Sequence, residues 1–390
     1  GHDFSGTLNI AGTGNNYLIF GTNASTAAGE HSLFTGTPDL VMDEGAKVII
    51  NRLFTGATLA EAKTNALTVG NLSGAGEFRG DYNDVETDRA SQRFLSVTQT
   101  RDEIYSGIFT TASSGRDIGL LKNGSGTLTL SGANTSQADL DINAGGIILS
   151  GAGVWKGAIN LTAAGSTLTY ANTSAITQGT AVTAAAGSSI NFTGGQTYTL
   201  SNESNAIAGS VSVGKAGDAT GTKLVLSGGF GAGSISLATD QDALELSGAD
   251  KELSGELSGN GSLSVTGGTQ TLSYANSAFT GAVSVSGGTL RAGSNTALGN
   301  SDIDVSGTGA LDVNGKTLAN KVFLTGGSLA GGNASSIGDL SVNVAGAASA
   351  SVKTTSLTGA LSVDNLSLSS YNTFAASDNL IVRSTMTLGR

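Results

Sequence analysis

Short strands separated by glycine-containing turns recur along most of this chain, and this pattern limits the folds that it can adopt. In the segment from Leu120 to Thr135, the run 127–130 alternates hydroxyl and apolar side chains and has glycines on both sides. Such alternation places the apolar side chains on one face of a strand. A unit this small cannot bury that face by itself, so it must stack on neighbouring units.

The spacing of these strands distinguishes between the β folds that use short strands. From Leu120 onward they arrive every ~8–12 residues, and the spacers between them, such as Ser-Gly, Gly-Gly and Asn-Gly, permit positive-φ turns. A sandwich, a barrel and a parallel β-helix all use such strands. Runs of three or four residues are too short for a sandwich, and the spacing persists longer than one closed β domain usually runs. We therefore predict an all-β fold, a right-handed parallel β-helix (β-solenoid).

Composition agrees with thin stacked layers. Apolar residues make up 38% of the chain and aromatic residues only 5%, so the core must be built from small aliphatic side chains. The combination of 59 glycines with one proline argues against collagen and against proline-rich linkers. Disorder is the alternative for a chain rich in Gly, Ser and Thr, but Leu, Val and Ile recur along its whole length.

Charge and cysteine content exclude several partners and sites. The net charge of −11 contains no basic runs, which argues against nucleic acid and anionic membranes as partners. The absence of cysteine excludes disulfides and thiolate metal sites. No segment approaches the roughly 18 uninterrupted apolar residues of a membrane helix. No signal peptide precedes the chain, so a secreted protein would have lost its leader before residue 1, and Gly1-His2 also fits a cloning scar.

We expect three segments. Residues 1–66 form an irregular N-terminal β region, with strands at 17–20 and 48–50 and one or two helical turns at 58–63. Residues 67–119 form the first β-helix coils, and a charged loop leaves them at about 80–93, where Arg89 and Arg93 act as local counter-charges. Residues 120–390 form the β-helix with repeats.

One repeat carries a recognisable motif. Its defining positions are Lys122, Gly124, Gly126, Thr127, Leu128, Leu130, Gly132 and Asn134. This pattern closely resembles the passenger-associated repeat of bacterial autotransporters (type V secretion), and a degraded second copy runs from Gly255 to Gly281. The resemblance covers residues 67–150 well and 255–315 moderately. It implies a passenger domain displayed outside the cell or on its surface, with a signal peptide and a C-terminal outer-membrane barrel elsewhere in the gene. It also implies a repeat that helps secretion and folding, without catalytic residues or cofactors.

Catalytic constellations are scarce. Ser-His-Asp or Cys-His catalysis needs histidine or cysteine, and only His2 and His31 are present. Two acidic clusters, Asp81/Asp84/Glu86/Asp88 and Asp240/Asp242/Glu245, are the candidates for Ca²⁺ binding or glycan cleavage. The first lacks the glycine pivot and terminal Glu of an EF-type loop, and a solvated loop is the favoured interpretation. We expect no enzymatic activity, no metal site and no cofactor.

Three features are candidates for binding. Arg79-Gly80-Asp81 spells the tripeptide that integrins recognise, but a three-residue match in a glycine-rich chain favours coincidence. Rows of Ser, Thr and Asn on outer strand positions predict hydrogen-bonded ladders first, and a wall that meets a glycan or an identical wall second. Trp155, Tyr170, Tyr198 and Tyr274 either cap coils or stack on sugars.

These observations predict an extracellular structural or adhesive protein exported across the outer membrane. Its partners would be host or neighbouring-cell surfaces, glycans or extracellular matrix. One alternative is a self-assembling solenoid, because an uncapped coil exposes unpaired backbone groups. The other alternative, a β-helical glycan-active enzyme or phage spike, is disfavoured by the missing groove of acidic and aromatic residues.

Overall fold

The computed structural model of this protein describes most of the chain. The described residues are 5–12, 18–20, 36–50, 58–80, 92–111, 117–218, 220–331, 335–342, 351–354, 361–368, 373–376 and 380–388. The chain divides into two compact units, Gly1–Thr193 and Gly194–Arg390. This division falls inside the segment 120–390, which we expected from the sequence to be one continuous β-helix.

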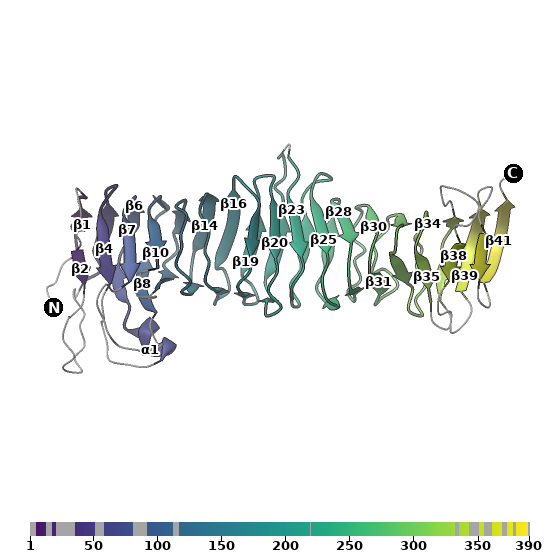
Figure 1. Cartoon of the computed structure of the whole chain (residues 1–390), viewed down its shortest axis with the longest axis horizontal. Coiled ribbons are helices and arrows are strands. Elements are labelled where there is room, and N and C mark those ends of the chain that lie inside the picture. The colour runs from purple at the N-terminus through teal and green to yellow at the C-terminus, as the bar shows by residue number, and fades with distance from the viewer. Residues whose placement is uncertain are drawn as a thin grey trace. The chain divides into compact units, whose positions relative to one another are not determined.

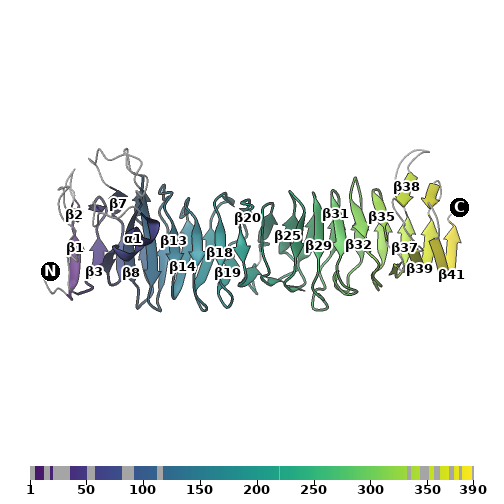
Figure 2. The same ribbon diagram turned by 90° about the horizontal axis from the view of Figure 1, so that it is seen from below.

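Unit 1 is a parallel β-solenoid (Figures 1 and 2). Its first sheet contains β1 (Thr7–Ile10), β3 (Asp39–Met42), β6 (Leu72–Gly74), β9 (Glu103–Tyr105), β12 (Thr127–Leu130), β14 (Gly146–Gly151), β16 (Thr167–Asn172) and β19 (Ser189–Phe192). Its second sheet contains β2 (Leu18–Phe20), β4 (Lys47–Ile50), β7 (Glu77–Gly80) and β10 (Ile108–Thr110). Its third sheet contains β5 (Leu67–Val69), β8 (Arg93–Thr98), β11 (Ile118–Asn123), β13 (Leu140–Ile142), β15 (Ile159–Leu161) and β18 (Val182–Ala184), and β17 (Ile176–Gln178) follows β16 along the chain.

Unit 2 repeats this architecture. One sheet contains β22 (Ser210–Val213), β24 (Ile235–Leu237) and β27 (Leu257–Gly259). The longest contains β20 (Thr197–Leu200), β23 (Lys223–Leu226), β25 (Ala243–Leu246), β28 (Ser262–Val265), β30 (Val283–Val285), β32 (Ile303–Val305), β34 (Val322–Leu324), β37 (Leu340–Val342), β39 (Leu361–Leu368), β36 (Ser336–Ile337) and β41 (Leu380–Leu388). A third contains β26 (Lys251–Leu253), β29 (Thr269–Leu272), β31 (Thr289–Ala292), β33 (Ala310–Asp312), β35 (Ser328–Ala330), β38 (Ser351–Thr354) and β40 (Thr373–Ala376), and β21 (Ala206–Ile207) precedes β22. The predicted all-β parallel solenoid is confirmed.

The core of each unit consists of aligned inward-facing side chains. In the first sheet of unit 1, Leu128 pairs in register with Ile147, which pairs with Leu168. At the next inward position, two residues along the strand, Leu149 pairs with Tyr170. The Tyr170 and Phe192 rings stack with centroids 5.0 Å apart. Every one of these side chains is at most 1% exposed. The alternation of apolar and hydroxyl residues therefore sends the apolar half into the stack, as the sequence predicts.

The expected helical turns at 58–63 form α1 (Leu59–Thr64), which projects from the side of unit 1 (Figure 1). Thr58 caps its N-terminus in a capping box with Glu61. Ala62 packs on Phe94 and Leu121 of the third sheet. No described helix is long and apolar enough to cross a membrane.

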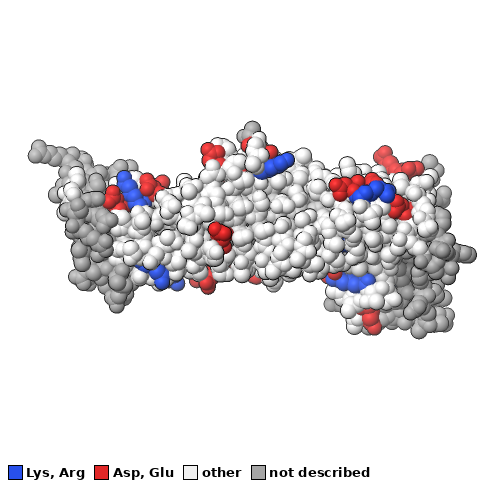
Figure 3. Space-filling model, turned by 180° about the vertical axis from the view of Figure 1, so that it is seen from behind, with Lys and Arg blue, Asp and Glu red and all other residues white. Residues whose placement is uncertain are grey.

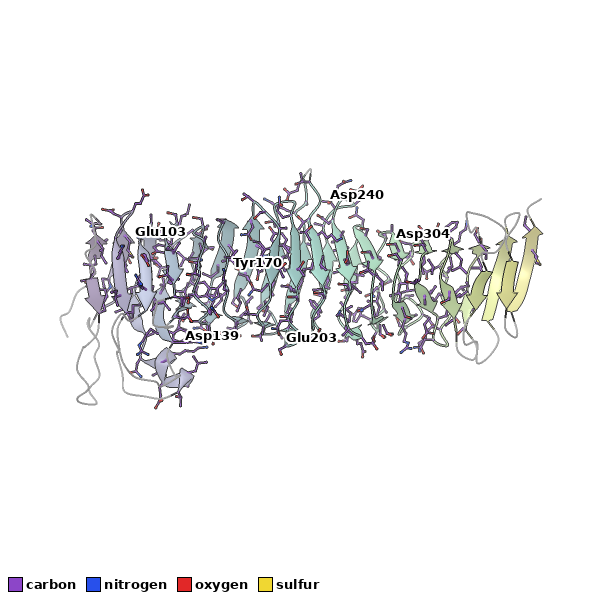
Figure 4. The ribbon with its side chains drawn as sticks, in the orientation of Figure 1. Glu103, Asp139, Tyr170, Glu203, Asp240 and Asp304 are labelled. Atoms are coloured by element: carbon purple, nitrogen blue, oxygen red, sulfur yellow. The ribbon has the colours of Figure 1, made fainter. Side chains whose placement is uncertain are left out.

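Lys63 fastens α1 to the third sheet. Its Nζ lies 2.7 Å from Asp141 and 3.0 Å from Asp139, and Figure 4 shows Asp139 on the side of the solenoid where α1 projects. Burial opposes the charge on Lys63, but the hydrogen bonds to Asp141 and Asp139 raise the pKa of Lys63 above its ordinary value.

The boundaries of the expected charged loop are strand residues. Gly80 ends β7 and pairs with Ile50, and Arg93 begins β8 and is only 5% exposed. Arg93 is therefore a buried residue of the solenoid, not a counter-charge in a solvated loop. Residues 81–91, with Arg89 and the first acidic cluster, lie outside the described residues.

Two glycines with similar backbone conformation but different surroundings test how closely the coils stack. Gly124 has φ +76° and Gly165 has φ +79°. A Cβ at Gly124 would lie 2.3 Å from the Gln99 carbonyl oxygen, whereas a Cβ at Gly165 would meet nothing within 4 Å. Of these two glycines, Gly124 is constrained by the neighbouring coil as well as by its own turn, and Gly165 only by its turn.

We predict that Gly165→Ala lowers the free energy of unfolding by about 1 kcal/mol, the cost of the left-handed conformation. Gly124→Ala adds a clash with backbone and should lower it by about 3 kcal/mol or more. Urea unfolding followed by circular dichroism measures both. Equal losses would show that the spacing between coils at Gly124 is not restrictive.

Candidate functional site

Three of the residues that define the first repeat, Lys122, Gly124 and Gly126, lie at one corner of unit 1, between β11 and β12. Lys122 is completely buried there, and its Nζ donates to the carbonyl oxygens of Asn123, Gly124 and Ala144, each at 3.0 Å. Ala144 belongs to the next coil, because it follows β13, which pairs with β11. The ammonium therefore joins the corners of two successive coils.

The environment of Lys122 changes its protonation. Burial lowers the pKa of Lys122 to about 8, because the charged form loses its hydration, and the negative charge of Asp102 partly opposes this shift. The three carbonyl oxygens are hydrogen-bond acceptors, and the ammonium supplies an N–H donor to each of them. The charge is thus held in the interior by backbone dipoles rather than by an adjacent carboxylate.

The glycines and strand residues of the repeat lie at this corner, in β12, and at the next corner, between β12 and β13. A Cβ at Gly126 would lie 2.5 Å from the Arg101 carbonyl oxygen, and one at Gly132 would lie 2.0 Å from the Gly107 carbonyl oxygen. The Thr127 amide donates to the Asp102 carboxylate at 2.7 Å. Leu128 and Leu130 point inward and are fully buried. Each defining position therefore serves the stacking of coils.

Asn134 bridges three coils. Its Oδ1 accepts from the Phe109 amide at 2.8 Å in the preceding coil, and its Nδ2 donates to the Val154 carbonyl oxygen at 2.9 Å in the following coil. It is 1% exposed. Both ends of its amide thus replace backbone partners that the corner would otherwise leave unpaired.

The second repeat contains the same bridge at Asn276, which sequence reasoning did not assign. Its Oδ1 accepts from the Leu257 amide and its Nδ2 donates to the Ala297 carbonyl oxygen, both at 2.7 Å. The shared signal is visible in the sequence, since Leu-Ser-Gly-Ala-Asn at 130–134 matches Leu-Ser-Tyr-Ala-Asn at 272–276.

A second corner lysine, Lys251, was also missed, and it is only half-buried. Lys251 Nζ donates to the carbonyl oxygens of Leu226, Ser247 and Ala249, and Gln270 donates to Ala249 and Gly267. Burial lowers the pKa of Lys251, although Glu203 and Asp250 act in the opposite direction. Unit 2 therefore also uses a lysine to hold a corner, but this lysine is half-buried and is placed after the turn instead of before it.

The remaining candidate residues do not converge on one site. Arg79 and Gly80 lie in β7, where Arg79 pairs in register with Thr110, and Asp81 lies outside the described residues. In the second acidic cluster, Asp242 is buried and accepts from the Thr222 and Thr239 amides, whereas Glu245 pairs with Lys223 at 2.6 Å. Within the described ranges, no group of three or more His, Cys, Asp or Glu could hold a metal ion.

The candidate aromatic residues separate into two groups. Trp155, Tyr170 and Tyr198 are each 1% exposed and belong to the interior; Figure 4 labels Tyr170 in the stack of strands of unit 1. Trp155 donates to the Ala138 carbonyl oxygen at 2.7 Å and packs against Phe109. Tyr274 is 46% exposed. The first three therefore serve packing, and only Tyr274 is displayed.

Stacked parallel coils with corner residues of this kind define a repeat-built β-solenoid. Residues 120–149 and 258–292 match the passenger-associated-transport-repeat family. The chain thus carries the repeat of autotransporter passenger domains at two places, and the resemblance to that class is confirmed. No curated protein and no solved structure matches the chain at a significant level.

We predict that Asn134→Ala leaves the Phe109 amide and the Val154 carbonyl oxygen unpaired, at a cost of about 2–4 kcal/mol. Hydrogen exchange resolved by residue measures this directly. The Phe109 amide should lose protection in Asn134→Ala, and the Leu257 amide should lose it in Asn276→Ala. Each variant serves as the control for the other, and loss of protection at both amides in either variant would contradict a local bridge.

The lowered pKa of Lys122 predicts a pH dependence of stability. Between pH 8 and about 10.5 the unfolded chain binds more protons at this lysine than the folded chain, so its contribution to stability rises with pH, by up to about 3 kcal/mol. Urea unfolding of the wild type and of Lys122→Met at pH 7 and pH 10 measures this contribution, as the difference between their free energies of unfolding. If the two proteins differ in free energy of unfolding by the same amount at both pH values, burial of the ammonium would be contradicted.

Proposed function

We propose that this chain is a surface-displayed or secreted passenger that acts by contact, in attachment, aggregation or matrix formation, and that it is not an enzyme. The observation that carries the proposal is the regular outward row of side chains on the solenoid walls. In unit 1, Thr129, Ile148, Thr169 and Asn191 occupy matching outward positions of β12, β14, β16 and β19. Parallel pairing repeats such positions about every 4.8 Å.

On the third sheet of unit 1, hydrogen bonds between neighbouring coils hold a second set of outward groups in place. Asn143 donates to Asn123 at 3.0 Å and accepts from Thr162 at 2.6 Å. On the same sheet, Asn160 donates to Asp141 and accepts from Thr183, both at 2.8 Å. A wall whose side chains are already ordered loses little conformational entropy when a partner binds.

The distribution of charge supports contact through uncharged surface. On the face shown in Figure 3, Lys, Arg, Asp and Glu gather in a few groups, and most of the surface carries none of them. Weak contacts repeated along such a wall add up through multivalency. The same surface supports the alternative, in which identical walls meet and the protein self-assembles.

Support for a non-enzymatic role comes from how the described acidic residues are used. Asp141 pairs with Lys63, Asp242 caps a corner, and Asp312 pairs with Arg291 at 2.8 Å. The chain has two histidines and no cysteine. A hydrolase would need a carboxylate pair or a nucleophile with its base at one place.

We predict saturable binding of the labelled protein to cells, glycan arrays or matrix proteins, without turnover of any polysaccharide. Heat-unfolded protein is the control, and electron microscopy of the protein alone tests self-assembly. Asp81→Ala, with Asp84→Ala as its control, tests attachment through Arg79-Gly80-Asp81. A protein that neither binds nor assembles would contradict the proposal. Polysaccharide cleavage that is abolished by substituting one carboxylate would also contradict it.

A further inference from the structure

Tyr274, at 46%, is the only Tyr, Trp or Phe among the described residues that is exposed. The other exposed large hydrophobic residues are aliphatic or Met, namely Leu18, Leu59, Ile104 and Met386. Because nearly half of Tyr274 remains exposed to solvent, packing of the coil alone does not explain an aromatic ring here.

The repeat itself does not require an aromatic residue here. The corresponding position of the first repeat is Gly132, where even a Cβ would lie 2.0 Å from the Gly107 carbonyl oxygen. The same corner thus excludes a side chain in unit 1 and displays a large ring in unit 2. This contrast separates Tyr274 from the residues that stack the coils.

The backbone that carries Tyr274 is held firmly on both sides. Leu272 is buried two residues before it, and Asn276 bridges to neighbouring coils two residues after it. Ser294 Oγ donates to the Tyr274 carbonyl oxygen at 2.9 Å from the next coil. A ring on a fixed backbone offers contact area at low entropic cost, since only two side-chain torsions remain free.

Polar and charged residues lie on the strand that ends just before Tyr274 and on its neighbours in the same sheet. Glu252, Thr271, Arg291 and Asp312 occupy matching positions of β26, β29, β31 and β33. Glu252 accepts from the Ser273 hydroxyl, directly before Tyr274. Arg291 pairs with Asp312 and keeps a 44% exposed side chain. Carboxylate acceptors and a guanidinium donor therefore accompany an apolar ring.

We propose that Tyr274, Glu252 and Arg291 form a contact site for a neutral glycan. The ring stacks on the apolar face of a sugar, and the carboxylate and guanidinium bind its hydroxyl groups through charge-assisted hydrogen bonds. Two carboxylates against one guanidinium, on a chain of net charge −11, disfavour acidic glycans. The site rests on the proposed contact function and names its ligand class.

The test uses the full chain with cellohexaose and chitohexaose as neutral probes and a chondroitin sulfate hexasaccharide as the acidic probe. Calorimetric titration should show binding to at least one neutral hexasaccharide and none to the acidic one. Tyr274→Ala should weaken that binding at least tenfold, whereas Tyr274→Phe keeps the ring and should change it less than threefold. Ile104→Ala removes an exposed apolar side chain from unit 1 and should leave it unchanged.

Circular dichroism should show that all variants remain folded, because both positions are exposed. No binding of either neutral probe, preference for the acidic probe, or unchanged binding by Tyr274→Ala would overturn the site. Attachment to cells that persists without hexasaccharide binding would overturn this site and leave the contact function standing. Hexasaccharide binding through Tyr274 without attachment to any cell or matrix would support the site and contradict the adhesive function.

Discussion

The hydrogen bond from a corner side chain to the backbone of a neighbouring coil is the interaction on which both units depend. Strands pair with strands, but at each corner the chain turns and its amides and carbonyls lose that partner. Lys122 and Asn134 in unit 1, and Lys251 and Asn276 in unit 2, supply the missing donors and acceptors. Because an unpaired buried backbone group costs about 1–3 kcal/mol, few other side chains are tolerated at these positions.

This constraint also explains the chemistry of the interior. A lysine is ordinarily solvated, and burial lowers the pKa of Lys122 to about 8. Its ammonium is kept inside because three carbonyl oxygens from two coils converge on it. A buried polar residue in a solenoid is therefore first explained by contacts between coils and only then by a ligand site. Buried candidates such as Asp242 are explained in this way.

The fold was largely predictable from the sequence, because strand alternation, glycine turns and the cap at Thr58 are local signals. The defining positions of the first repeat were predictable for the same reason, but their roles were not. Burial of Lys122 and Arg93 depends on neighbouring coils, whereas the sequence shows only charged residues that are usually exposed. The four aromatic residues looked alike in the sequence, and only the placement of each strand end separates Tyr274 from Tyr170.

The division between interior and wall bears on where function can evolve in such a chain. Changing a corner residue affects at least two coils at once, as the three-coil bridge of Asn134 shows. Changing an outward residue affects only its own position and its ladder neighbours. Gly132 and Tyr274 illustrate the difference, since the same place in two repeats is closed to side chains in one and displays a ring in the other. Outward residues can therefore change while the stacking residues that make the coils remain the same.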